Sequence, residues 1–266
     1  MDIAGKVFVV TGGGNGIGRE VVLELLRRGA QVAAVDLSAA GLAETARLAA
    51  APQGRLSTHT VNVADRGAVE ELPEQVIAAH GQVDGLLNVA GIIQRFVTVS
   101  DLSVEEIERV MAVNFWGTLY TTKAFLPHLL ARPQASLLNV SSMGGLVPVP
   151  GQGAYGASKG AVKLLTECLY AELRDTSVAV TVVFPGAVGT DITGNSGVEA
   201  PVVQGGKTPK VTAADAAGRQ IVDAVASGTF RVLIGSDARM LDRLSRVAPT
   251  RAITTVADQM RKLLGV

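Results

Sequence analysis

The sequence has little of what marks disulfide, metal or nucleic-acid-binding proteins. Its single cysteine, Cys168, cannot form an intrachain disulfide and suits a reducing compartment. Its three histidines, His59, His80 and His128, lack metal-ligand spacing, so no metal site is predicted. Lys and Arg total 24 and Asp and Glu total 24, and no basic run predicts a nucleic-acid partner. The expected partner is a small molecule or another copy of the chain.

Long hydrophobic runs are also missing. No stretch approaches the roughly 18 apolar residues of a membrane span, so no integral membrane segment is predicted. Residues 1–6 lead directly into an apolar run without the pattern of a signal peptide, and we therefore expect a cytoplasmic protein. The 266 residues, 48% of them hydrophobic, are enough for one large core, and no linker or repeat divides them. We predict a single domain over residues 1–266.

Short apolar runs alternate with amphipathic stretches along most of the chain. The runs predict strands at residues 7–10, 31–35, 59–63, 83–89, 136–140, 178–184 and 231–234. Helices are predicted at residues 16–28, from Ser38 to about 50, from Asp65 or Arg66 to 80, and at 104–113, 115–130 and 154–174. Such alternation is typical of a parallel sheet with helices on both faces.

Two segments depart from this alternation. Residues 186–211 are rich in Gly, Pro, Thr and Ser, and a loop of this length is usually functional, so we predict a substrate lid at about 190–211. Residues 237–266 carry apolar side chains at helical spacing and predict a C-terminal helical extension, broken near Pro249. We expect it to pack over the lid or against a neighbouring subunit. Its interspersed arginines leave a role at a membrane surface as an alternative.

A glycine-rich segment, Thr11-Gly12-Gly13-Gly14-Asn15-Gly16-Ile17-Gly18, joins the first predicted strand to the first helix. Glycines allow close approach of a ligand, and a helix N-terminus favours an anion, so the segment predicts a site for the pyrophosphate of a dinucleotide. The alternative is a simple glycine turn. Asp36 ends the second strand, where a carboxylate can hold the adenosine ribose and repel a 2′-phosphate. This favours NAD(H) over NADP(H), unless Asp36 only caps the following helix.

Tyr155 and Lys159 lie four residues apart and therefore share one face of a predicted helix. A nearby ammonium lowers the pKa of a phenol and makes it a better proton acceptor, although a Tyr–Lys pair at a helix surface is a common alternative. Other polar groups follow strand ends and should meet at one edge of the sheet. They are Asn88-Val89-Ala90-Gly91, Asn139-Val140-Ser141-Ser142 and Pro185-Gly186-Ala187-Val188-Gly189-Thr190, with Asn114 in the helical stretch between.

In this order and spacing, the motifs resemble those of the short-chain dehydrogenase/reductase family, over residues 6 to about 234. Val89 is one departure, because the family often has asparagine there. The resemblance implies a doubly wound α/β Rossmann fold with seven parallel strands in the order 3-2-1-4-5-6-7. It also implies NAD(P)-dependent oxidation or reduction at a CH–OH group and assembly as a homotetramer through helices 115–130 and 154–174.

The resemblance also implies roles for individual residues. Tyr155 is expected to be the general acid and base, and Lys159 to bind the nicotinamide ribose and lower the tyrosine pKa. Ser142, in preference to Ser141, is expected to hold the substrate oxygen, and Asn114 to support a water chain to Lys159. Contacts with the cofactor are expected from Gly12, Asn15, Gly16, Ile17, Gly18, Asp36, Val63, Asp65, Asn88, Ala90, Gly91, Tyr155, Lys159, Pro185, Gly186, Val188 and Thr190. Among these, the resemblance implies that Val63 and Asp65 flank the adenine and that Val188 and Thr190 bind the nicotinamide carboxamide.

The substrate pocket is expected near these motifs, lined by Ile92, Ile93, Gln94, Met143, Val149, Gln152 and Gly186. Most of these side chains are apolar, which favours a largely apolar secondary alcohol or ketone. Lys207 and Lys210 in the lid could attract an anionic substrate, or could simply be solvated. Two other functions stay open: an NADPH-dependent ketoreductase for a carrier-bound substrate, and a dinucleotide-sensing binding protein without turnover.

Overall fold

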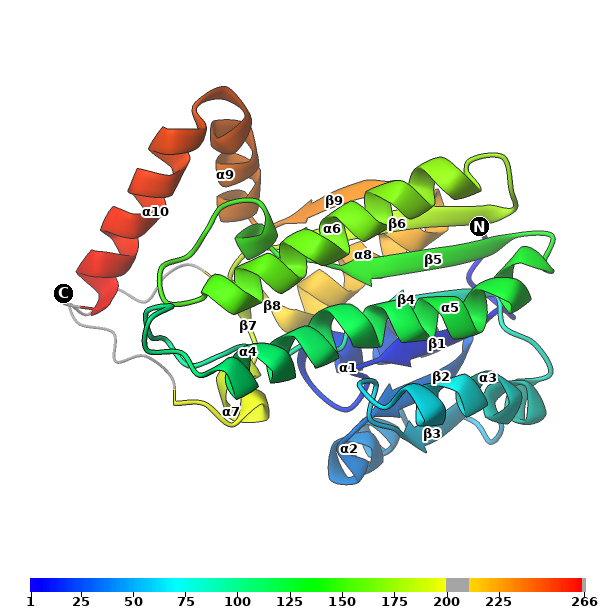
Figure 1. Cartoon of the computed structure of the whole chain (residues 1–266). Coiled ribbons are helices and arrows are strands. Elements are labelled where there is room, and N and C mark those ends of the chain that lie inside the picture. The colour runs from blue at the N-terminus through cyan, green and yellow to red at the C-terminus, as the bar shows by residue number, and fades with distance from the viewer. Residues whose placement is uncertain (200–210, 265–266) are drawn as a thin grey trace.

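The computed structural model describes residues 1–199 and 211–264. Part of the predicted lid, with Lys207 and Lys210, lies outside the described residues. A seven-stranded parallel sheet runs in the order β3-β2-β1-β4-β5-β6-β9 (Figure 1). Its strands are β1 Val7–Thr11, β2 Gln31–Asp36, β3 Leu56–Thr60, β4 Gly85–Asn88, β5 Ala135–Val140, β6 Val178–Pro185 and β9 Arg231–Ile234. The predicted doubly wound fold and strand order are confirmed.

Helices cover both faces of this sheet. They include α1 Gly16–Arg27, α2 Ala39–Ala49, α3 Arg66–His80, α4 Val104–Met111, α5 Gly117–Leu130, α6 Gly153–Leu173 and α8 Ala214–Ser227. The side chains of β1 alternate between the faces: Phe8 and Val10 pack with α1 and α8, whereas Val7 and Val9 pack with α3, α5 and α6. A strand that is buried on both faces must be apolar at every position, which explains the continuous apolar run.

The third strand lies earlier than the sequence predicts. β3 pairs with β2 from Leu56 to Thr60, whereas residues 59–63 were expected to form it. The chain leaves the ladder because Asn62 forms a turn, in which its carbonyl accepts from the Asp65 N–H at 2.9 Å. The apolar Val61 and Val63 suggested a strand, but β3 is an edge strand with polar residues and needs no such run.

The helix predicted at 104–113 and that predicted at 115–130 form one continuous helical stretch. A π-helical segment, Ala112–Trp116, joins α4 directly to α5. Wide turns of this kind occur frequently at functional sites, and this one contains the buried Asn114. The sequence also gave no prediction for the segment that forms α8, which packs extensively on α1.

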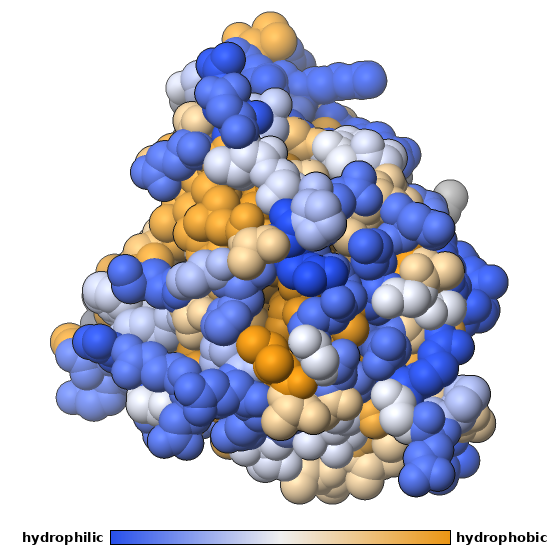
Figure 2. Space-filling model, turned by 90° about the vertical axis from the view of Figure 1, so that its right-hand side faces the viewer, coloured by the Kyte–Doolittle hydropathy of each residue, from blue (hydrophilic) through white to orange (hydrophobic). Residues whose placement is uncertain are grey.

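The chain beyond the sheet gathers at the carboxyl ends of the strands, on the left of Figure 1. Here lie the short pair β7 Val188–Gly189 and β8 Thr212–Ala213, helix α7 Ile192–Ser196, and a hairpin of α9 Ser236–Val247 and α10 Pro249–Leu264. The predicted break near Pro249 is the turn of this hairpin, because proline suits the first position of a helix. Seen from the opposite end, the surface is mostly hydrophilic with a few apolar patches (Figure 2).

Candidate active site

The glycine-rich segment forms a tight turn between β1 and α1. Gly12 has a φ of +72°, and a side chain there would lie 2.9 Å from the main chain of Ala90. A side chain on Gly18 would overlap the carbonyl of Gly12, so α1 can approach the turn only with glycine at this position. Because α1 begins at Gly16, the N–H of Ile17 lies in its first turn, where helical N–H groups lack an intrahelical acceptor. The turn therefore has the shape and the donors for a pyrophosphate.

Asp36 lies beside this turn at the end of β2. Its two carboxylate oxygens accept from the N–H groups of Gly14 and Ser38, each at 2.9 Å. The N-cap of α2 is Ser38, whose hydroxyl accepts from Gly41 N–H at 3.0 Å. Helix capping is thus the role of Ser38, and Asp36 presents a carboxylate to the glycine-rich turn.

The two expected adenine contacts lie at the end of the third β-α connection. Asp65 is exposed and caps α3, accepting from Ala68 N–H at 3.2 Å. Val63 is buried against Gly117, where an added side chain would lie 2.8 Å from its methyl group. Val63 is therefore packed into the protein, while Asp65 stays open to a ligand.

The side chain of Asn88 is used inside the protein. Its amide donates to Asn139 at 2.9 Å, and its carbonyl oxygen accepts from Thr121 at 2.7 Å. Only the main chain of Asn88 is thus left for the predicted cofactor contact. Thr11 was not among the predicted site residues. Its hydroxyl accepts from the N–H groups of Val89 and Ala90 and so holds the main chain that follows Asn88.

The structure gives the two adjacent serines different surroundings. Ser141 is buried, and its hydroxyl donates to the carbonyl of Lys159 at 2.7 Å. Ser142 accepts from Gly144 N–H at 3.0 Å and forms a hydrogen bond with Tyr155 that favours the phenolate. This arrangement agrees with the expectation that Ser142, and not Ser141, faces the substrate oxygen.

Tyr155 and Lys159 lie at the start of α6, one turn apart. Burial raises the pKa of the Tyr155 phenol above its ordinary value, and the hydrogen bond from Ser142 opposes this rise. Burial lowers the pKa of Lys159 to about 8, and its ammonium donates to the carbonyl of Val140 at 3.0 Å. The sequence-based expectation that the ammonium lowers the tyrosine pKa is therefore not met in this structure, because desolvation dominates for both groups.

Asn114 connects the π-helical segment to both α6 and the loop after β4. Its side chain exchanges two hydrogen bonds of 2.9 Å with the main chain of Ile92. It also donates to Ser158 at 2.9 Å, and Ser158 donates to the carbonyl of Tyr155 at 2.7 Å. A side chain on Gly91 would lie 3.0 Å from the Lys159 nitrogen and 3.3 Å from the Asn114 oxygen. These predicted residues therefore meet at one place.

Gln94 does not line a pocket as predicted. It is fully buried, and its amide oxygen accepts from Tyr155 N–H at 2.9 Å while its nitrogen donates to the carbonyl of Gly151. It therefore holds the start of α6, because Tyr155 lies in the first turn and needs an acceptor. Gln152 is also buried and donates to the carbonyl of Gln94 at 3.0 Å. Its own side-chain oxygen has no partner among the described residues.

The loop after β6 lies against the glycine-rich turn. A side chain on Gly16 would lie 3.3 Å from the methyl group of Thr190, so these two predicted cofactor contacts are neighbours. Asn15 donates to Asn195 of α7 at 2.7 Å. Ile93 is buried, and its N–H donates to Ser196 of α7 at 3.0 Å. The described part of the lid thus bridges the turn and the loop after β4.

The C-terminal hairpin packs on the segment that follows Ser142. Leu241, Ala252 and Val256 are buried there with Val147. Met143, Leu146, Val149, Leu244 and Met260 are partly buried around this cluster. The hairpin therefore covers the predicted pocket residues Met143 and Val149.

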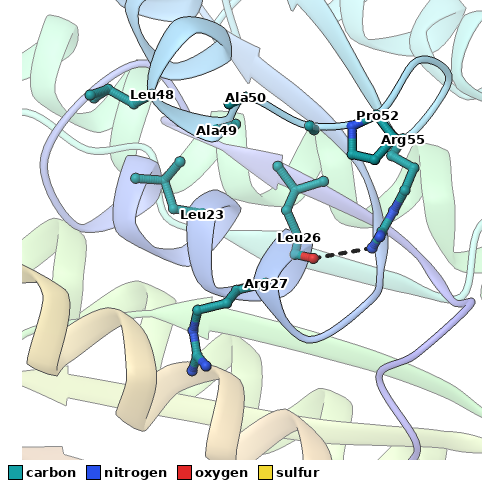
Figure 3. A pocket seen from close by; sticks show the side chains of 9 residues that line it. Leu23, Leu26, Arg27, Leu48, Ala49, Ala50, Pro52 and Arg55 are labelled. Carbon is teal, nitrogen blue, oxygen red and sulfur yellow. Dashed lines mark hydrogen bonds between the residues drawn. The ribbon is translucent and has the colours of Figure 1, made fainter.

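Two grooves on the protein lie away from Ser142, Tyr155 and Lys159. One, of about 330 Å³, lies between the ends of α1 and α2 that are far from the glycine-rich turn (Figure 3). Leu23, Leu26 and Leu48 line it, and Arg55 donates to the carbonyl of Leu26 at 3.1 Å. A second, of about 340 Å³, lies between α4 and the end of α7 and is lined by Arg95, Glu105, Glu106, Arg109, Gly197 and Val198. Neither groove is lined by Tyr155 or by a residue of the glycine-rich turn.

Among the described residues, no helix is long and apolar enough to cross a membrane. Residues 1–199 and 211–264 also contain no group of three or more His, Cys, Asp or Glu that could hold a metal ion.

Comparisons with known proteins agree with this geometry. The family model for short chain dehydrogenase matches residues 6–200. The SadH protein of Mycobacterium tuberculosis, named as an oxidoreductase, is 38% identical over 256 residues, which cover 91% of each chain. The 3-oxoacyl-[acyl-carrier-protein] reductase FabG of Thermotoga maritima is 33% identical over 193 residues, covering 73% of this chain and 78% of FabG.

Solved structures show the same fold. A short chain dehydrogenase/reductase from Burkholderia phymatum in complex with NAD superposes with a TM-score of 0.84 at 25% identity, covering 95% of this chain and 97% of that one. A short chain dehydrogenase from Burkholderia cenocepacia in complex with NADP gives 0.81 at 26% identity, covering 96% and 99%. The chain described here therefore belongs to the short-chain dehydrogenase/reductase family of NAD(P)-binding oxidoreductases.

Proposed function

We propose that this protein transfers a hydride between NAD(H) and a secondary alcohol or ketone of largely apolar character, with Tyr155 donating and accepting the proton. The observation that carries the proposal is the convergence of four groups. The Ser142 hydroxyl and the Tyr155 ring both border Gly144, and Ser142 opposes the rise in the Tyr155 pKa. Asn114 reaches the Tyr155 carbonyl through one serine. Lys159 and Asn114 both flank Gly91.

The residues divide the chemistry as follows. The bound nicotinamide supplies or takes the hydride. In reduction, the neutral Tyr155 hydroxyl donates its proton to the substrate oxygen, and its raised pKa keeps it in this donor form at neutral pH. Ser142 donates a hydrogen bond to the same oxygen. In oxidation, the phenolate of Tyr155 accepts the proton, and the Ser142 hydroxyl, which opposes the rise in the phenol pKa, favours this form.

The test is a panel of secondary alcohols with NAD⁺, followed by the absorbance of NADH. Tyr155→Phe should lower turnover by several orders of magnitude, on the order of 10³ or more, while NADH still binds. Tyr170→Phe is the matched control, because Tyr170 lies on the same helix and is 46% exposed. Near-normal turnover of Tyr155→Phe would contradict the mechanism. NADH binding without turnover on any alcohol or ketone would support the dinucleotide-sensing alternative.

The preference for NAD(H) rests on Asp36. Its carboxylate lies against the glycine-rich turn, where it can bind two ribose hydroxyls but repels a 2′-phosphate. Because structural neighbours were solved with either NAD or NADP, they do not decide this point. We expect a higher kcat/KM with NAD⁺ and a shift toward NADP⁺ in Asp36→Ser. A higher kcat/KM with NADP⁺ in the unaltered protein would instead favour the ketoreductase alternative, which the FabG name supports.

The apolar character of the substrate is supported by the hairpin. Met143 and Val149 pack with Leu244 and Met260, so the region beyond Ser142 is bounded by apolar side chains.

The buried side-chain oxygen of Gln152 lacks a partner among the described residues. Because buried acceptors are normally hydrogen-bonded, a donor group on the substrate could bind to it. We expect kcat/KM to rise with the apolar surface of the alcohol, and equal values across a chain-length series would contradict this.

The protein is further proposed to be a cytoplasmic homotetramer. Exposed apolar side chains, Trp116, Leu130 and Leu164, lie along or next to α5 and α6. Such side chains suit an interface between copies. The exposed thiol of Cys168 fits a reducing compartment. Light scattering should give the mass of four chains, and a monomer would refute the assembly.

A further inference from the structure

One carboxylate of the C-terminal hairpin reaches into the cofactor loop. Asp237 lies in the first turn of α9, and its Oδ2 accepts from the N–H of Ala187 at 2.7 Å. Ala187 is fifty residues earlier in the chain and immediately precedes Val188. The two segments therefore meet only through the tertiary structure.

The protein is shaped around this carboxylate on two sides. A side chain on Gly186 would lie 2.3 Å from both oxygens of Asp237. A side chain on Gly235, which has a φ of +99°, would lie 2.3 Å from Oδ1. No other residue type fits at these two positions without moving the carboxylate, so Asp237 occupies a slot between two glycines.

Ala187 is held from its other side as well. Its carbonyl accepts from Thr212 N–H at 2.8 Å, which is part of the β7–β8 pairing. The next residues turn sharply, since Thr190 N–H donates to the Val188 carbonyl at 2.8 Å. Fixing Ala187 at both its N–H and its carbonyl therefore fixes the direction in which Val188 and Thr190 leave the sheet.

We propose that Asp237 is a positioning residue that presets the 187–190 loop for the nicotinamide half of the cofactor. The C-terminal hairpin thereby becomes part of the cofactor site. This inference rests on the proposed contacts of Val188 and Thr190 with the nicotinamide carboxamide. A charged acceptor holds an N–H more strongly than a neutral one, and a preset loop spares the cofactor the cost of ordering it.

The test compares two ligands that differ in the nicotinamide. Dissociation constants are measured by calorimetry for NADH and for ADP-ribose, which keeps the adenosine, the pyrophosphate and the second ribose but lacks the nicotinamide. In Asp237→Ala, NADH should bind about tenfold more weakly, as expected for the loss of one charge-assisted hydrogen bond. ADP-ribose affinity should stay within about twofold, because this ligand lacks the nicotinamide, which is the part of the cofactor that the 187–190 loop is proposed to bind.

Three further variants sharpen the result. Asp237→Asn retains an oxygen in the slot and should rescue most NADH affinity. Asp237→Glu keeps the negative charge near the start of α9 but is too long for the slot, so it should show the same selective loss if Asp237→Ala does not fold. Asp258→Ala, at an exposed acid on α10, is the matched control and should bind both ligands normally.

Equal weakening of NADH and ADP-ribose, or unchanged NADH affinity in Asp237→Ala and Asp237→Glu, would overturn the inference while leaving the proposed function intact. Failure of the unaltered protein to bind NADH at all would overturn both.

Discussion

Lys159 should make the stability of this protein depend on pH. Its side chain is 3% exposed, and burial lowers its pKa from the ordinary 10.5 to about 8. Between these two values, the unfolded chain holds a proton that the folded chain has released. Because the unfolded state then binds more protons, the free energy of unfolding rises with pH across this range.

The magnitude follows from the shift. Each unit by which a pKa moves corresponds to about 1.4 kcal/mol, so a fall from 10.5 to about 8 corresponds to about 3 kcal/mol. Below pH 8 both states carry the ammonium, and the folded state bears the full cost of burying it. Above pH 10.5 neither state is charged and the cost vanishes.

The assay is urea unfolding at several pH values between about 7 and 10.5, comparing the unaltered protein with Lys159→Met. The variant keeps most of the apolar stem but cannot titrate. The difference in unfolding free energy between the two proteins should therefore change by about 3 kcal/mol across this interval, in favour of the unaltered protein at high pH.

Lys163→Met is the matched control on the same helix. The Lys163 side chain is 25% exposed, and its ammonium pairs with Glu167 at 2.8 Å. Its curve should run parallel to that of the unaltered protein. Parallel curves for Lys159→Met as well would refute the reasoning, since they would mean that the Lys159 ammonium is solvated in the fold.

Three other substitutions test the site and its support. Gly91→Ala should lower kcat about 10- to 100-fold, because the added methyl group would displace the Lys159 nitrogen, now 3.0 Å away, or the Asn114 oxygen. Asn114→Ala should lower both the melting temperature and kcat, since it removes the three hydrogen bonds of the buried Asn114 side chain, worth about 1 kcal/mol each. Arg132→Ala should lower the free energy of unfolding by about 3 kcal/mol, because the fully buried Asp84 carboxylate loses its guanidinium partner at 2.9 Å.

Controls separate these effects from general damage. Gly67→Ala adds a methyl group that meets no atom closer than 3.5 Å and should leave kcat unchanged. Arg66→Ala breaks an exposed pair and should change the free energy of unfolding by less than about 1 kcal/mol. A kcat for Gly91→Ala equal to that of Gly67→Ala, unfolding of Asn114→Ala at the original temperature, or equal unfolding free energies for the two arginine variants would each contradict the corresponding prediction.

Several local features were predictable because their causes are local. The continuous apolar run of β1 reflects burial on both faces, and Ser38 and Asp65 cap α2 and α3 as their residue types indicate. The edge strand β3 was misplaced because an exposed edge places few demands on its residues. Two separate helices were predicted where α4 and α5 are continuous through a π-helical turn, because no periodic pattern of apolar residues marks such a turn.

The tertiary structure brings some of the predicted site residues together at the site and uses others for internal hydrogen bonds. Ser142 and Tyr155 are brought together, whereas the side chains of Asn88 and Gln94 serve the internal hydrogen-bond network. Both amides are polar residues at the expected edge, and only their partners show that they are already occupied. Asp237 carries no signal in the sequence, because its contact with Ala187 joins segments fifty residues apart.

The sequence by itself determined the seven strands of the sheet and the helices of the first β-α connections, the glycine-rich turn and the Tyr155–Lys159 pair, because each depends on spacing along a single element or on one β-α connection. Only the tertiary structure decided how strongly those groups are buried. The pKa of Lys159 near 8, the raised pKa of Tyr155 and the placement of the hairpin over Met143 all arise from atoms distant in the chain. Desolvation and packing are properties of the assembled fold, and no local pattern of residues encodes them.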